Sequence, residues 1–308
     1  MNRMASKTRR IPKSLFLLVA IAIPVVILAV LLEPFLFPRA ARVRAWSPTT
    51  KARAEANDIR PGFGESKTGA IPVLVLESRP MDPKARARRH RILHAKLAEA
   101  RLGPLLFELQ DLPGKSLKQL TAALDRLPSG CHVVLEISLP DLVLEARDPK
   151  SRPEPSAVLE THTGSFPAAL WPLRRMGAPK ETQRYDRVGA TLLEWKQRIE
   201  ANHGRLVLLY LPQPIECDPG QLAVELETLG LDSSQLQSNR AARRMQDLCR
   251  ELKIPFVDPT RLLAGSLRNK RPLFDDVGAA PFAALYTERA ENLILGRLAR
   301  QGIQPLFK

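Results

Sequence analysis

The sequence predicts a three-layer α/β fold with a mainly parallel, five-stranded sheet behind an N-terminal transmembrane helix. Five short apolar runs rich in Val, Ile and Leu show little alternation, which is typical of strands covered on both faces. Segments with helical spacing separate these runs, and strands that alternate with helices indicate parallel pairing through right-handed crossovers. An uncharged stretch long enough to cross a bilayer precedes the first run.

The uncharged stretch runs from Leu15 to Leu32, eighteen residues, inside a predicted anchor at 14–37. At about 1.5 Å per helical residue it covers roughly 27 Å, close to the hydrocarbon core of a bilayer. A cleaved signal peptide is the alternative, but its apolar part is usually about 7–15 residues and ends at small residues. Here bulky and basic residues follow, so we expect an uncleaved anchor.

The orientation of this anchor rests on its short basic tail, residues 1–13. Five Lys and Arg residues precede the apolar stretch and five follow it before residue 54, so their count does not decide the orientation. We expect the tail in the cytoplasm and the rest of the chain outside it, in a single-pass protein of the inner membrane with a periplasmic main domain. Residues 38–70, polar and rich in Pro and Gly, are interpreted as a linker.

The main domain is expected at 71–308. Its predicted strands are the five apolar runs at 71–78, 104–110, 131–138, 205–212 and 254–260. Helical spacing is visible at 90–102, 116–127, about 190–202 and 283–300. Residues 140–185 break the alternation because they hold six prolines and two clusters of charge, and we interpret them as an inserted loop region.

The charge balance indicates an anionic neighbour. The 308 residues include 47 Lys and Arg against 32 Asp and Glu, a net charge of +15. The bilayer, its lipid headgroups or an anionic glycan are the expected partners. With 5% aromatic residues and no recognition motif, nucleic acid is not expected. The basic runs at 84–91, 239–244 and 268–271 are solvated helix faces or loops, or a specific binding surface.

Cofactor and metal chemistry are not predicted. The three cysteines, Cys131, Cys217 and Cys249, are too scattered for a zinc site or a disulfide scaffold and suit small core residues, although one disulfide is conceivable in an oxidising compartment. His90 and His94 are four residues apart on one predicted helix, but no third ligand accompanies them.

Ligands of open α/β sheets bind beyond the carboxyl ends of the strands. The first strand ends in Leu-Glu-Ser, with Ser78 last, and a Pro-Gly pair at 113–114 follows the second strand. The third strand is followed by Ser-Leu-Pro-Asp-Leu at 138–142, and the segment RPLFDDVGAAPFAAL at 271–285 precedes the last helix.

These strand ends resemble the SGNH, or GDSL-type, hydrolase family over about 71–302. The resemblance implies a flavodoxin-like strand order, with Ser78 at the nucleophile position and Glu77 in place of the family's Asp. It places Gly114 at the glycine of the second block and Asp141 where an oxyanion-hole Asn is expected. In the family's closing Asp-x-x-His segment, Asp276 and Pro281 match and Gly278 occupies the histidine position.

The departures from the family argue against catalysis. A serine hydroxyl needs a base within about 3 Å, and Gly278 cannot act as one. His132 and His203 fall at the wrong end of the sheet, so His162 in the insertion is the candidate substitute. A carboxylate at Asp141 would repel a developing oxyanion. Glu77 and Asp276 remain candidates for acid/base chemistry, although salt bridges in this basic chain are the simpler expectation.

The sequence therefore predicts a membrane-anchored pseudo-hydrolase. Because related domains accompany membrane-bound O-acyltransferases, the resemblance implies an accessory or binding role in envelope polysaccharide modification, with such an acyltransferase as a partner. One alternative is an active serine esterase or O-acetyltransferase that uses Ser78 with an unrecognised base. Another alternative is that the protein is a structural scaffold. For Ser78 itself, the alternative is a serine that ends a strand and never had a catalytic role.

Overall fold

The computed structural model describes the chain from residue 70 to residue 307 with gaps. The described residues are 70–78, 83–102, 105–111, 117–139, 141–142, 158–161, 164–175, 179–229, 234, 236–269, 271–275 and 285–307. Within these ranges no helix is long and apolar enough to cross a membrane. The predicted anchor at 14–37 and the linker at 38–70 lie outside them, apart from residue 70.

A five-stranded parallel sheet forms the centre of the protein, which confirms the predicted α/β class. The strand order is β2-β1-β3-β6-β7, the doubly wound arrangement with its switch point between β1 and β3. The strands span Ile71–Glu77 (β1), Leu105–Asp111 (β2), His132–Ser138 (β3), Leu206–Leu211 (β6) and Phe256–Val257 (β7). Each of the five overlaps one of the apolar runs of the sequence, although β7 covers only two residues of the run at 254–260. Strands covered on both faces need apolar side chains on both.

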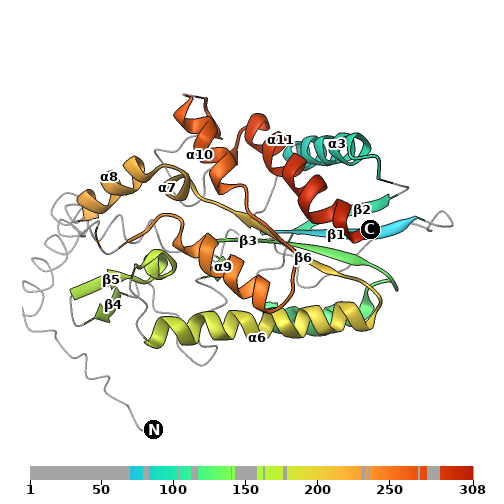
Figure 1. Ribbon diagram of the computed structural model, residues 1–308, viewed down its shortest axis with the longest axis horizontal. Helices are drawn as coiled ribbons and strands as arrows, with labels where there is room; N and C mark the ends of the chain where they lie inside the picture. The colour runs from blue at the N-terminus through green and yellow to red at the C-terminus, as the bar shows by residue number, and fades with distance from the viewer. Residues whose placement is uncertain are drawn as a thin grey trace, which may run out of the picture.

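Helices cover both faces of this sheet (Figure 1). On one face lie α6 and α9, together with the α4–η2 turn; on the other lie α3, α10 and α11. Their bounds are Pro83–Glu99 (α3), Leu117–Leu120 (α4), Thr121–Arg126 (η2), Pro179–Ala201 (α6), Arg240–Glu251 (α9), Thr260–Arg268 (α10) and Glu288–Arg297 (α11). The fold is therefore a three-layer sandwich with two hydrophobic cores.

Smaller elements complete the described chain. They are β4 (Val158–Thr161), β5 (Gly164–Pro167), η3 (Ala168–Leu173), α7 (Pro214–Cys217), α8 (Pro219–Leu229), β8 (Phe274–Asp275), β9 (Leu285–Tyr286), η5 (Leu298–Ile303, a π-helical turn) and η6 (Gln304–Phe307). β4 and β5 form an antiparallel pair within the predicted insertion. The helix predicted from about Ala190 begins at Pro179, so regular structure occupies the end of that region as well.

The alternation of the central strands decides which side chains meet which helices. Leu74, Leu76 and Leu135 face the α6 side, whereas Val73 and Val134 face the α3 side. Trp195 of α6 is fully buried, and its indole Nε1 donates to the main-chain oxygen of Leu117 at 2.9 Å. Each layer is thus fixed by apolar packing, and polar residues on these strands have to find partners inside the protein.

Candidate functional site

Several polar residues lie at the carboxyl ends of the strands, where an open α/β sheet places its ligands. They include Glu77 and Ser78 at the end of β1, Ser138 and Asp141 at the end of β3, Gln213 and Glu216 after β6, and Asp258 and Thr260 after β7. Neighbouring parallel strands bring these residues to one edge of the sheet.

Ser78 lies directly after β1, at the position predicted for a nucleophile. The residue is 7% exposed. Its hydroxyl has no hydrogen-bond partner among the residues that the structure describes. A serine becomes a useful nucleophile only when a base accepts its proton, and the described part of the chain brings no such group to Ser78.

The described histidines lie elsewhere. His132 begins β3 at the opposite end of the sheet and packs edge-on against Phe307, as its predicted position implied. His203 follows α6 in an exposed turn at φ 63°. His90 and His94 lie on the exposed side of α3, where the His90 ring stacks on Phe107 with 4.5 Å between centroids. Burial lowers the pKa values of His90 and His132, so both rings favour the neutral form.

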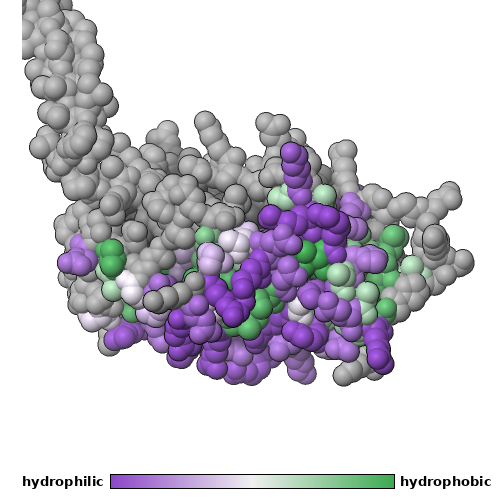
Figure 2. Space-filling view, turned by 90° about the horizontal axis from the view of Figure 1, so that it is seen from above, coloured by the Kyte–Doolittle hydropathy of each residue, from purple (hydrophilic) through white to green (hydrophobic). Residues whose placement is uncertain are grey.

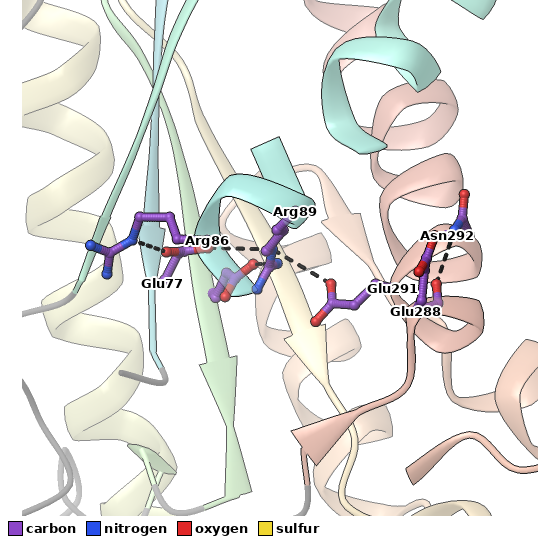
Figure 3. Close-up of polar contacts among 7 residues, drawn as sticks. Glu77, Arg86, Arg89, Glu288, Glu291 and Asn292 are labelled. Carbon is purple, nitrogen blue, oxygen red and sulfur yellow. Dashed lines mark hydrogen bonds and ion pairs between the residues drawn. The ribbon is translucent and has the colours of Figure 1, made fainter. Parts of the chain in front are cut away.

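Glu77 is the last residue of β1 and enters a buried ion cluster (Figure 3). Its carboxylate lies 3.3 Å from Nε of Arg86 and 3.3 Å from Nε of Arg89, both on α3. Arg89 also lies 3.6 Å from the carboxylate of Glu291 on α11 and donates a hydrogen bond to Glu136 in the middle of β3. Glu77 is therefore engaged in ion pairs, as the basic composition led us to expect.

This cluster joins α3 and α11 to the sheet. Arg89 is 1% exposed and Glu136 is fully buried. Burial alone would lower the pKa of the Arg89 guanidinium, but Glu136, Glu291 and Glu77 together raise it above its ordinary value. A buried cation among three carboxylates fixes how α3 and α11 sit on β1 and β3, and loss of the cation would be costly.

Asp141 is used locally, at the start of the turn after β3. Its Oδ2 accepts hydrogen bonds from the main-chain N–H of Ser138 at 2.8 Å and from the Ser138 hydroxyl at 2.5 Å. This is the geometry of a helix N-cap, in which a carboxylate three residues on accepts the N-cap N–H. Asp141 thus shapes the chain after β3.

A buried carboxyl group after β6 was not predicted from the sequence. Oε2 of Glu216 accepts the main-chain N–H of Gln213 at 2.8 Å, and Oε1 accepts the hydroxyl of Tyr210 at 2.6 Å. Glu216 is 3% exposed and Tyr210 is fully buried. Burial raises the pKa of Glu216 to about 8, despite both hydrogen bonds, and Asp258 adds to the rise. The sequence signal was the box Gln-Pro-Ile-Glu at 213–216, which repeats the spacing of Ser138 and Asp141.

Other predicted site residues lie outside the described part of the chain. They are Gly114, His162, Asp276, Gly278 and Pro281, so their predicted roles stay predictions. Among the described residues no group of three or more His, Cys, Asp or Glu side chains could hold a metal ion. Cys131, Cys217 and Cys249 are buried free thiols, in keeping with their interpretation as core residues.

Together these contacts define the class of the protein: a doubly wound α/β domain whose described polar residues at the strand ends mostly hold the fold together. No protein-family model matches the chain, and no curated protein matches it. Among solved structures, the chain is similar to protein YxiM from Bacillus subtilis, with 12% identity and a TM-score of 0.43. That match covers 77% of this chain and 58% of YxiM, so the chain spans less than two thirds of the length of YxiM.

Proposed function

We propose that this protein is a membrane-anchored, SGNH-like domain without hydrolase activity that serves as an accessory or binding protein in envelope polysaccharide modification. The strand order is compatible with the SGNH resemblance of the sequence, and Ser78 lies at the end of β1 as that resemblance requires. The apolar stretch Leu15–Leu32 supports an anchor, and the net charge of +15 supports an anionic partner. A membrane-bound O-acyltransferase is the expected membrane partner.

One observation carries the non-catalytic part of the proposal. The Ser78 hydroxyl is buried and has no hydrogen-bond partner among the described residues, so none of the described histidines activates it. General-base assistance contributes about 10²–10⁴-fold to such reactions, and without it serine acylation would be correspondingly slow. The neighbouring carboxylates do not replace the base, because Glu77 is ion-paired and Asp141 caps a turn.

Turnover of a small acetyl ester tests this proposal. The full chain is purified in a neutral detergent, and hydrolysis of 4-nitrophenyl acetate is compared for the wild type, Ser78→Ala and Ser138→Ala. Ser138 is the matched control, since it is also a buried serine at a strand end. We expect the same slow rate from all three proteins. A wild-type rate at least 100-fold above that of Ser78→Ala, with Ser138→Ala unaffected, would establish an esterase instead.

A further inference from the structure

Arginines gather where three elements of the α6 face meet: the residues after η3, the start of α6 and the start of α9. We call Arg175, Arg184, Arg240, Arg243 and Arg244 the arginine surface. Arg174 forms an antiparallel bridge with Leu236, and the N–H of Gln237 donates to the oxygen of Leu173 at 2.8 Å. These bonds bring the chain after η3 beside the segment that leads into α9.

Two buried rings hold part of this surface in place. Trp171 of η3 and Tyr185 of α6 are 3% and 6% exposed and meet edge to face, with 5.0 Å between centroids. The guanidinium of Arg184 lies 5.2 Å from the centre of the Trp171 ring, and that of Arg244 lies 5.4 Å from the centre of the Tyr185 ring. Cation–π contacts of this kind hold a guanidinium in a fixed orientation. Arg184 and Arg244 are therefore pre-organised.

The charges of the α9 arginines are not balanced within the described protein. Arg240, Arg243 and Arg244 share one stripe of the helix, at spacings of three and four. None of the three forms an ion pair with a described residue, whereas Arg250 at the end of α9 pairs with Asp247 at 3.2 Å. Positive charge at the start of a helix is also unfavourable with respect to the helix dipole. The folding of the domain alone does not account for these arginines.

The position of the surface relates it to the edge of the sheet where ligands are expected. Both α6 and α9 are crossover helices that run back from the carboxyl end of one strand to the start of the next. Their first turns therefore lie at the carboxyl edge of the sheet, the edge that also carries Ser78 and Ser138 (Figure 1). An extended ligand could contact the arginine surface and this edge together.

We propose that the arginine surface binds a carboxylate-bearing polysaccharide chain; this inference rests on the proposed role in polysaccharide modification and names its binding surface. Guanidinium groups match carboxylates in a two-pronged geometry, and five cations spread over three elements suit a polymer with repeated charges. A lipid surface fits less well, because membrane-docking helices insert apolar side chains. Of the described residues, the exposed large hydrophobics are Leu193 and Val224, and neither belongs to the arginine surface.

Calorimetric titration of the full chain in neutral detergent with oligogalacturonate tests this inference. The variant Arg175→Gln/Arg240→Gln/Arg243→Gln removes three charges from the surface and spares both arginines that pack on the rings. The matched control is Arg91→Gln/Arg268→Gln/Arg271→Gln, which removes three exposed arginines from the α3 and α10 face. Figure 2 shows that face, where hydrophilic residues predominate around smaller hydrophobic areas. Both variants have the same net charge. A difference in their affinity for the oligomer therefore shows that the location of the arginines matters, and not only their number.

We expect the wild type and the control to bind alike and the surface variant to bind at least tenfold more weakly, a loss of about 1.4 kcal/mol. Binding should also weaken with added salt and vanish for the methyl-esterified oligomer. Absence of wild-type binding, or equal losses in both variants, would overturn the inference. If the triple variant is unstable, the single variant Arg243→Gln can be compared with the wild type instead, because Arg243 is exposed.

Phosphatidylglycerol vesicles provide the comparison for a lipid source of negative charge. If the wild type did not bind the oligomer and the surface variant lost the vesicle binding that the wild type shows, the arginine surface would be a membrane contact and the inference would be wrong. Ester turnover that depends on Ser78 would overturn the proposed lack of catalysis. Even then, a tenfold loss of oligomer binding in the surface variant would support the arginine surface as the binding site. The two failures are therefore distinguishable.

Discussion

Replacement of Arg89 by Met should strongly destabilise the protein. The variant keeps an unbranched side chain that fills the inner part of the site but removes the cation that Glu77 approaches at 3.3 Å and Glu291 at 3.6 Å, and that donates to Glu136. Arg86 stays beside Glu77, so the main loss falls on Glu136 and Glu291. Removal of one partner from a buried ion cluster costs about 3–5 kcal/mol, a large share of the roughly 5–15 kcal/mol that stabilises a typical protein.

The cost should depend on pH with a definite sign. Buried carboxylates that lose a neighbouring cation favour the neutral form, so their pKa values in the folded variant rise above those of the unfolded chain. Such a group contributes its full stabilisation of the folded state at pH values below its unfolded pKa. This contribution is lost as the pH rises through the pKa of the folded state. The deficit of Arg89→Met relative to the wild type should therefore be largest at pH 7.5 and shrink toward pH 5.

Urea unfolding followed by tryptophan fluorescence measures this free energy, because Trp171 and Trp195 are buried. Arg250→Met serves as the control, since this arginine is exposed and pairs only at the surface. Its unfolding midpoint should hardly change. A cost below about 1 kcal/mol for Arg89→Met at pH 7.5, or an equal cost at both pH values, would refute the account of the cluster.

Three further changes test other parts of the structure. Glu216→Gln should raise the free energy of unfolding by a few kcal/mol at pH 9 and have little effect near pH 4.5. The reason is that a pKa of about 8 means that the folded state disfavours the ionised carboxyl. If urea unfolding gave the same difference between the two proteins at every pH in this range, the prediction would be wrong. Ser78→Ala should leave the free energy of unfolding unchanged or raise it by up to roughly 1 kcal/mol, since it removes a buried hydroxyl without a described partner. A loss above about 2 kcal/mol in urea unfolding would reveal a hydrogen bond that stabilises the fold. Gly204→Ala should destabilise by about 1–3 kcal/mol or more, because a Cβ there would lie 2.0 Å from the main-chain oxygen of Cys131; an unchanged melting curve would show that this close packing relaxes freely.

The sheet could be predicted from the sequence because its strands carry the strongest local signal. Each buried strand needs apolar residues on both faces, and the five runs predicted as strands in the main domain each contain one in the part that the structure describes. Helix limits were harder to predict. α9 is a basic run in the sequence, and its buried residues Ala241, Ala242, Met245 and Cys249 include small side chains that give little hydrophobic signal. The start of α6 was missed because prolines precede it and charged residues fill its first turns.

The position of Ser78 could be predicted, but the use of its neighbours could not. The strand ends follow from the apolar pattern, and the SGNH resemblance implied the strand order, whereas the partners of a carboxylate depend on which distant residues the fold brings to it. Arg89 of α3 is near Glu77 in the sequence, yet Glu291 joins them from α11 near the end of the chain. A Glu in the middle of the apolar run 131–138 was the available sign of a buried ion cluster, since such a charge requires a partner.

The measurement that tests the central claim most directly is the intact mass of the full chain after exposure to a serine-reactive fluorophosphonate. The claim is that Ser78 occupies the position of a nucleophile without a base that activates it. The account predicts no adduct on the folded wild type, the same result as for Ser78→Ala. A single adduct on the wild type and on Ser138→Ala that disappears in Ser78→Ala would contradict the claim and show that the chain supplies a base to Ser78.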